Sequence, residues 1–202
     1  MRKKACSFFP IAAALAVSSL CGSCKGGRLS LAAVEPHVVY DFSTGEAGDQ
    51  YLVVFVRTEG GGDVDAVSLA CQADSLCWHG MSVSKVSEDC FFSVFSPAPG
   101  AVMQPADYRV TVTDCYGDSD TLSFSLRYDA DMASRASPEL LGAAGYLRRY
   151  AYFDGTGCLA IFDEIDKDGS IQKANKHIGG KRLCCISPDG NTVCLFPREE
   201  IY

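Results

Sequence analysis

The chain has 202 residues, of which 48% are hydrophobic and 21% are charged, and this balance excludes a wholly disordered protein. Its 19 glycines and 8 prolines are too few for a collagen-like or low-complexity chain. Eleven cysteines are many for this length, and such a density is typical of proteins whose thiols are oxidised after export or hold a metal ion. The net charge of −7 disfavours nucleic acid as a partner, because its phosphates are also negative.

The N-terminal segment has the pattern of an export signal. Positions 2–4 are basic, and residues 5–20 carry no charge. This apolar stretch is shorter than the roughly 20 residues that cross a bilayer, and it contains Pro10. The pattern therefore predicts a signal peptide over residues 1–23 and not a permanent transmembrane helix.

The signal ends in Leu20-Cys21-Gly22-Ser23-Cys24, which resembles the lipobox of bacterial lipoproteins, in the relaxed form of spirochaetal ones. In that family a peptidase cuts after a small residue, and the following cysteine receives acyl chains such as palmitate. Ser23 is small and Leu20 is not, so the resemblance favours lipidation at Cys24, with Cys21 as the alternative. Two or three acyl chains would hold the protein on a membrane, since each buried methylene contributes about 0.8 kcal/mol.

The resemblance implies a lipid-anchored protein of the bacterial cell membrane, periplasmic or surface-exposed, with residues 24–33 as a tether. A simple cleaved signal, with both cysteines in ordinary disulfides, remains the alternative.

Residues 34–129 are predicted to form a β-sandwich. Apolar and polar residues alternate in short runs, as in half-buried strands, at 38–42, 51–56, 66–71, 81–86, 90–95, 108–113 and 122–128. The glycine-rich segment Gly60–Asp63 predicts a hairpin turn and not a phosphate-binding loop, because no Lys-Ser or Lys-Thr follows it. About seven strands over about 100 residues is the size of an immunoglobulin-like sandwich.

The segment Pro-Ala-Asp-Tyr-Arg-Val at 105–110 resembles the tyrosine corner of immunoglobulin-like and fibronectin-like domains. The resemblance implies that Tyr108 begins the penultimate strand and that its hydroxyl bonds back to the backbone of the preceding corner. The turn at 114–118 is then the last hairpin of this domain. Val110 stands where an antibody domain has cysteine, so the resemblance is to the broad class.

Residues 130–145 are predicted to form a linker with a short helix, because Ser137 and Pro138 suit the N-cap and first position of a helix. Residues 146–202 are predicted to form a small β-meander of four or five strands. Asp-Gly pairs at 154–155, 168–169 and 189–190 separate its strand-like runs and favour hairpin turns. Packing on the first domain, or on another molecule, is expected to bury its second face.

The eight cysteines after Cys24 divide evenly between the two predicted domains. Two disulfides within each domain are the simplest expectation, although the spacing does not choose the pairs. The candidates are Cys71, Cys77, Cys90 and Cys115 in the first domain and Cys158, Cys184, Cys185 and Cys194 in the second. A cysteine-based metal or redox protein is the rival hypothesis, and His79 near Cys77 is its only histidine close to a cysteine.

The segment 164–171 resembles the first half of an EF-hand loop. Glu164, Asp166 and Asp168 would supply oxygens to a weakly bound calcium ion, but Asn175 occupies the position of the bidentate carboxylate. An acidic hairpin tip is the alternative, so no metal is assigned.

No short catalytic motif occurs in the sequence, and we expect neither an enzyme nor a cofactor. The predicted function is binding of a protein or another envelope partner, with the loops at Gly60–Asp63 and Pro97–Pro105 as candidate contact surfaces. A structural envelope spacer stabilised by disulfides is the alternative.

Overall fold

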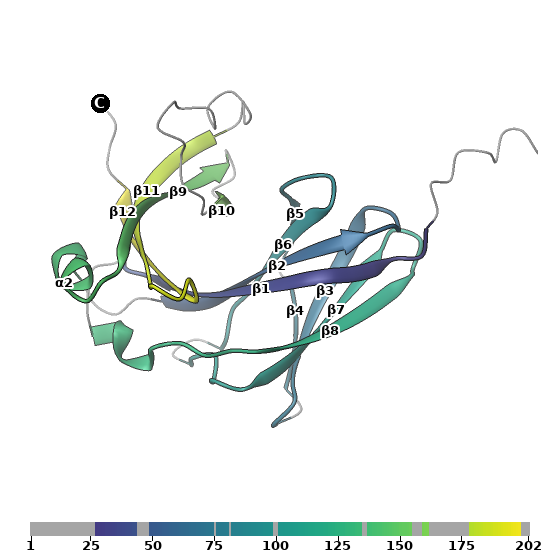
Figure 1. The fold of residues 1–202 in the computed structure, drawn as a ribbon, viewed down its shortest axis with the longest axis horizontal. Helices are drawn as coiled ribbons and strands as arrows, with labels where there is room; N and C mark the ends of the chain where they lie inside the picture. The colour runs from purple at the N-terminus through teal and green to yellow at the C-terminus, as the bar shows by residue number, and fades with distance from the viewer. Residues whose placement is uncertain are drawn as a thin grey trace, which may run out of the picture.

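The computed structural model describes residues 27–43, 49–74, 76–80, 82–98, 101–134, 137–154, 159–161 and 178–198. Over these residues the chain forms two β-sheets and two short helices (Figure 1). The predicted all-β class is thereby confirmed. Several predicted features lie outside the described residues: the signal peptide, Cys21, Cys24, Cys158, Glu164, Asp166 and Asp168.

The large sheet has eight strands in the spatial order β10-β9-β11-β12-β1-β2-β6-β5. Their bounds are β1 Ser30–Asp41, β2 Asp49–Glu59, β5 Val83–Lys85, β6 Cys90–Phe95, β9 Leu147–Asp154, β10 Leu159–Ile161, β11 Ile178–Ile186 and β12 Thr192–Arg198.

The small sheet has four strands in the order β4-β3-β7-β8. Their bounds are β3 Val64–Cys71, β4 Cys77–His79, β7 Asp107–Asp114 and β8 Ser119–Ser125. A short 3₁₀ helix at Ala130–Ser134 and the helix α2 at Pro138–Ala143 connect β8 to β9.

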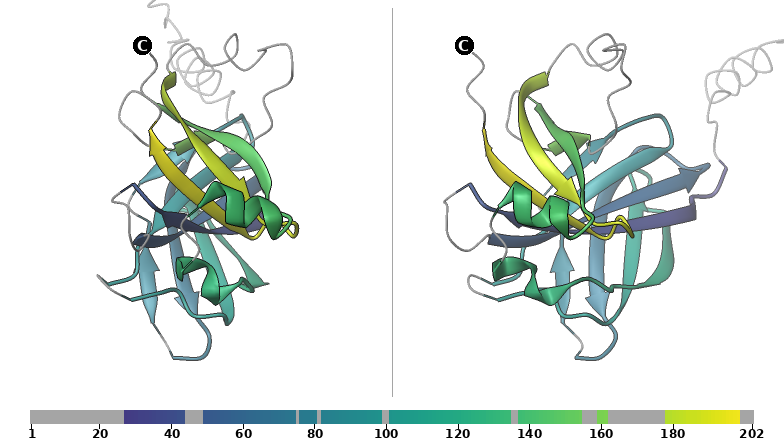
Figure 2. Two further views of the ribbon diagram at one scale, coloured as in Figure 1. Left: turned by 90° about the vertical axis from the view of Figure 1, so that its left-hand side faces the viewer. Right: turned by 60° about the vertical axis from the view of Figure 1, so that its left-hand side comes forward.

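Alternating burial explains how the two sheets pack. Along β7, Tyr108, Val110 and Val112 are buried while Arg109 is exposed, so one face of the strand turns inward. The large sheet contributes Tyr40 and Phe95 to the same core. Figure 2 shows the small sheet packed against the part of the large sheet that contains β1, β2 and β6. The period-two pattern thus builds a two-layer sandwich.

The last four strands extend the large sheet instead of packing on it as a separate layer. β12 runs parallel to β1, with Val38 opposite Thr192 and Asp41 opposite Leu195. In Figure 1, β9, β11 and β12 lie at the C-terminal end of β1 and curve away from the sandwich there. Backbone hydrogen bonds to β1 therefore join the C-terminal strands to the sandwich.

The predicted β-meander is wrong in its strand order. β11 pairs with β9 along the whole length of β9, on the side away from β10. In a meander β11 would pair with β10, but β10 and β11 lie on opposite sides of β9. The Asp189-Gly190 hairpin between β11 and β12 is confirmed, with Gly190 at a φ of 77°.

A buried ion pair reinforces the join between β11 and β1. The guanidinium of Arg182 donates from Nη1 to Asp41 Oδ2 at 2.8 Å and from Nη2 to Asp41 Oδ1 at 2.5 Å. Its Nε donates to the carbonyl of Phe196 at 2.7 Å. Burial alone would raise the pKa of Asp41, but hydrogen bonds from Arg182 and Ser43 outweigh it and lower that pKa.

The predicted start of α2 is confirmed. Ser137 is the N-cap, and its Oγ accepts a hydrogen bond from the amide of Leu140 at 3.2 Å. Leu141 is fully buried in the main core, so the helix is anchored by one apolar side chain.

Candidate functional site

The sandwich has two ends at which loops gather, and the candidate surfaces lie there. The tether end comprises residues 27–29 and the turns 60–63, 86–89 and 115–118. The far end comprises residues 72–74, the loop 101–106 and residues 126–128. Backbone bonds tie the far-end segments together, since Gln72 donates to the carbonyl of Asp107 and Leu126 to that of Ala106.

One carboxylate organises the tether end. Asp114 Oδ2 accepts from the amide of Gly62 at 2.9 Å, and its Oδ1 accepts from the amides of Tyr116 at 2.9 Å and Asp118 at 3.0 Å. These backbone hydrogen bonds, led by the one from Gly62, lower the pKa of Asp114. The ionised carboxylate therefore holds the turns 60–63 and 115–118 against each other.

The glycine-rich turn requires its glycines. Gly60 and Gly61 have φ angles of 68° and 73°, which other residues rarely adopt. A Cβ on Gly62 would lie 2.6 Å from Cys115 Sγ, so this position has no room for a side chain. The turn exists as predicted, but it does not form a hairpin. It carries the chain from β2 in the large sheet to β3 in the small sheet.

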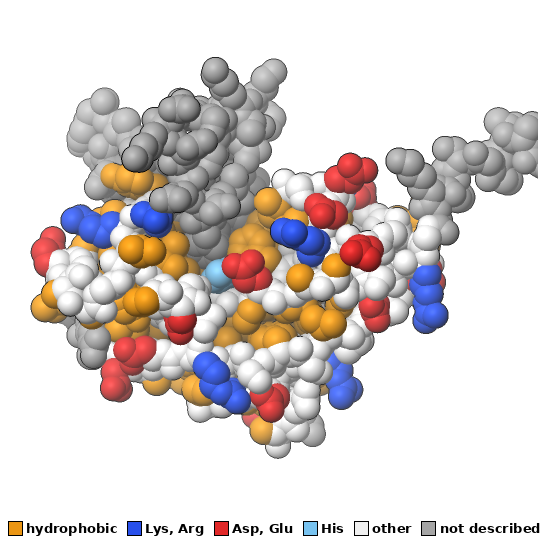
Figure 3. Space-filling view, in the orientation of Figure 1, with side chains coloured by type: hydrophobic (Ala, Val, Ile, Leu, Met, Phe, Trp, Pro, Cys, Tyr) orange, Lys and Arg blue, Asp and Glu red, His pale blue; other side chains and the backbone are white. Residues whose placement is uncertain are grey.

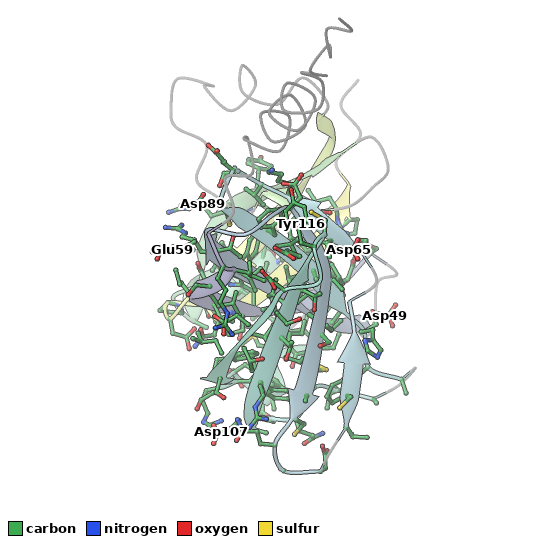
Figure 4. All side chains as sticks on the ribbon, turned by 90° about the vertical axis from the view of Figure 1, so that its right-hand side faces the viewer. Asp49, Glu59, Asp65, Asp89, Asp107 and Tyr116 are labelled. Carbon is green, nitrogen blue, oxygen red and sulfur yellow. The ribbon has the colours of Figure 1, made fainter. Side chains whose placement is uncertain are left out.

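The surface of the tether end is acidic. Figure 4 views the molecule from this end and labels Glu59, Asp65, Asp89 and Tyr116, and Figure 3 shows red acidic side chains gathered at the same end. Lys85 Nζ lies 2.5 Å from Asp63 Oδ1 and offsets part of this charge. Tyr116 is 73% exposed. The chain from residue 27 runs beside these turns, because Gly61 donates to the carbonyl of Gly27 at 2.7 Å.

Neutral side chains hold the loop of the far end. Gln50 is buried and accepts at Oε1 from the amide of Met103 at 2.5 Å. Its Nε2 donates to the hydroxyl of Tyr40 at 3.0 Å. The hydroxyl of Tyr128 donates to the carbonyl of Met103. Both backbone groups of Met103 are thus bound by side chains, and Met103 itself is 1% exposed.

The hydrogen bond of the predicted tyrosine corner is confirmed. Tyr108 donates from its hydroxyl to the carbonyl of Gln104 at 2.8 Å. Burial raises the pKa of Tyr108 well above its ordinary value, so the hydroxyl remains a donor. Its ring stacks on Phe124 with centroids 5.8 Å apart and contacts Trp78 at 6.1 Å. The hydrogen bond from Tyr108 therefore holds the loop 101–106 against the start of β7.

A shallow depression of about 390 Å³ opens at the far end. It is lined by four polar side chains and one aromatic ring, namely Gln72, Asp107, Ser123, Ser125 and Phe124. Gln72 Nε2 donates to Ser123 Oγ at 3.2 Å, and Ser125 Oγ donates to Asp107 Oδ1 at 2.5 Å. Its lining is mostly polar, unlike the enclosed apolar lining that is typical of small-molecule sites.

No disulfide joins any two of the seven described cysteines. In the first domain, Cys71 is buried on the inner face of β3, whereas Cys77 is exposed and pairs in register with Ala70. Cys90 lies on the large sheet opposite Arg57, and Cys115 lies in the turn after β7. No two of the four occupy opposite positions in the described registers, so none of them forms a directly facing cross-strand pair.

The hypothesis of a cysteine-based metal site has no assembled cluster of ligands in the part of the chain that is described. No three His, Cys, Asp or Glu side chains come together there to hold a metal ion. Cys77 and His79 are both exposed on β4. None of the described helices has the length and apolar character needed to cross a bilayer.

Sequence reasoning missed two residues that shape the candidate surfaces. Asp114 was assigned only to a turn, although aspartate two residues before a turn amide is a known local signal. Gln50 has no local signal, because Met103 is 53 positions away along the chain. No protein-family model and no curated protein matches this chain.

Proposed function

We propose that the protein is an exported lipoprotein, anchored in the bacterial cell membrane through Cys24, that acts by binding and not by catalysis. The observation that carries this proposal is the N-terminal sequence. A basic start and an uncharged apolar stretch lead into Ser23-Cys24, where the small residue precedes a cysteine as in a lipobox. Cys21 is the alternative lipidation site.

We further propose that residues 34–129 form an immunoglobulin-like domain. The strand order supports this proposal: β1-β2-β6-β5 corresponds to strands A-B-E-D of that fold, and β3-β7-β8 to C-F-G, with β4 added beside C. The Tyr108 hydrogen bond to Gln104 falls at the start of the strand that corresponds to F. Such domains carry many functions, so this likeness supports a binding scaffold and no particular activity.

The position of the tether favours the far end as the binding surface. Gly27 follows Cys24 by three positions, which corresponds to at most about 11 Å of extended chain. Gly27 is hydrogen-bonded to Gly61 at the tether end. An acylated Cys24 would therefore hold the tether end toward the bilayer and present the loop 101–106 and the depression near Asp107 to the surroundings.

Fatty-acid labelling tests the anchor. Cells that express the full chain are fed a radioactive or clickable fatty acid, and label on the purified protein is measured. We expect Cys24→Ala to abolish labelling and Cys21→Ala, the matched control, to retain it. Label that survives Cys24→Ala but not Cys21→Ala would move the anchor to Cys21, and an unlabelled wild-type protein would refute the proposal.

Cross-linking in the intact envelope, followed by purification in detergent, tests the binding surface. Val102 is 46% exposed in the far-end loop, and Tyr116 is exposed at the tether end. We expect Val102→Asp to reduce cross-linking to a partner and Tyr116→Asp to leave it unchanged. The reverse result would assign binding to the tether end. A protein that recovers only itself or wall material would instead be a spacer.

A further inference from the structure

Two cysteines of the C-terminal strands face each other directly. β11 and β12 form an antiparallel pair at the C-terminal part of the large sheet (Figure 1). In their register Cys185 lies opposite Cys194. Directly opposite residues on antiparallel strands have Cα atoms about 4.5–5.5 Å apart and project from the same face. Disulfides span Cα separations of about 4.4–6.8 Å, so this register falls within the required range.

Burial separates this pair from its neighbour Cys184. Cys185 and Cys194 are fully buried and belong to the main core cluster. Cys184 belongs to the apolar cluster on the other face of the large sheet, with Ala151 and Leu195. Successive residues of a strand project to opposite faces, so Cys184 cannot reach Cys194 without a shift of register.

We propose that Cys185 and Cys194 form a cross-strand disulfide in the exported protein. This inference rests on the proposed function in one respect only, because an oxidising compartment favours the bond. The bond would close the Asp189-Gly190 hairpin that supplies β12, the strand that joins β1.

The bond requires a disulfide as oxidant, such as oxidised glutathione or an envelope disulfide oxidoreductase. The thiolate of one cysteine attacks the donor disulfide, forms a mixed disulfide and releases one thiolate. The thiolate of the second cysteine then attacks the mixed disulfide at the protein sulfur, which forms the Cys185–Cys194 bond and releases the second thiolate. Two protein thiols are oxidised, one donor disulfide is reduced to two thiols, and the two protein protons pass to those thiols.

The buried position determines when this exchange takes place. Burial raises the pKa of the Cys194 thiol to about 12 and also raises the pKa of Cys185. Because exchange needs a thiolate and access to the donor, it proceeds during folding and stops once both strands are buried. The folded protein would consequently keep whichever redox state it acquired while folding.

One tryptic peptide reports on the pair. Cleavage after Arg182 and Arg198 releases residues 183–198, which contain Cys184, Cys185 and Cys194. The full chain is expressed with its own signal, and the cells are lysed in denaturant with an alkylating agent and no reductant. We expect this peptide to be two hydrogens lighter than its reduced form and to carry one alkyl group, at Cys184. A peptide with three alkyl groups, or a bond that includes Cys184, would overturn the proposal.

Two variants and one refolding experiment complete the test. Cys184→Ser should leave the internal bond intact, whereas Cys185→Ser should give two alkyl groups, at Cys184 and Cys194. Purified reduced chain, refolded with oxidised and reduced glutathione, should regain the bond without any export. The folded oxidised protein should resist reductant until denaturant is added, and reduction without denaturant would contradict the assignment.

This outcome is distinguishable from that of the proposed function. Acylation of Cys24 with three alkylated thiols in the peptide would refute the disulfide alone. An internal disulfide with no fatty acid on the chain would refute the anchor alone.

Discussion

The two ends of the sandwich are held by different chemistry. At the tether end, the ionised carboxylate of Asp114 accepts hydrogen bonds from backbone amides of two turns. At the far end, the neutral side chains of Gln50, Tyr108 and Tyr128 bind the backbone of one loop. Protonation of Asp114 in acid weakens the hydrogen bonds that its carboxylate accepts. The far-end side chains are already neutral, so acid does not change their hydrogen bonds in this way. The comparison therefore indicates that acid loosens the tether end first.

The far-end network should tolerate a wide range of pH. Burial, partly offset by the hydrogen bond from Gln50, raises the pKa of Tyr40 to about 12. Its hydroxyl therefore stays protonated across the range in which proteins are normally handled. A surface used for binding would keep its shape under conditions that alter the turns beside the membrane.

The largest expected effect comes from the ion pair between Arg182 on β11 and Asp41 at the end of β1. Replacing Arg182 with Met should lower the free energy of unfolding by about 3–5 kcal/mol, because Asp41 would be left half-buried without its partner. Urea denaturation of the variant measures this loss, and Arg148→Met on β9 serves as the exposed control. A loss no greater than that of the control would show that the ion pair contributes little to the join.

A smaller effect is expected from the tyrosine corner. Tyr108→Phe removes the donor to Gln104 and should cost about 1–3 kcal/mol of unfolding free energy at neutral pH. Tyr116→Phe is the matched control, since Tyr116 is largely exposed in a turn. The loss caused by Tyr108→Phe should be the same at pH 4 and pH 8, because the group is neutral at both. A loss that changes with pH would break the comparison between the two ends.

The subtlest expected effect concerns the acid response of the tether end. The folded pKa of Asp114 is lowered, so its stabilising contribution is present above the ordinary aspartate value of about 3.9 and is lost as the pH falls through the folded value. Asp114→Asn should destabilise the protein at pH 7 and flatten the decline in stability below about pH 4. Thermal unfolding across this range measures both, with Asp65→Asn as control. An unchanged acid slope would exclude Asp114 as the sensor.

Local patterns in the sequence predicted much of the sandwich. Alternation located the strands from β1 to β8 except β4, which has only three residues. Ser137 and the Asp189-Gly190 pair marked a helix start and a hairpin correctly, because each acts on its own neighbours. The tyrosine corner was predictable for the same reason, since Tyr108 and Gln104 are four positions apart.

Long-range contacts were not predictable from the same patterns. The pairing of β12 with β1 and the contact of Arg182 with Asp41 join residues far apart in the chain, the latter 141 positions. The pairing of the first-domain cysteines was not predictable, because cysteine spacing does not reveal which face of a strand each thiol occupies. The turn at Gly60 was predicted from its glycines. That it leads from the large sheet into the small sheet was not predictable, because β3 pairs with strands that come later in the chain.

The parallel pairing of β1 with β12 has a consequence for the order of events in the cell. One edge of β1 at residues 38–41 is covered only when residues 192–195 of β12 pair with it. Contacts between such distant segments slow folding, because a long loop must close first. Until the last strands have emerged, the exposed edge of β1 is open to pairing with a wrong strand. Covering of this edge therefore depends on strands that are synthesised much later than β1.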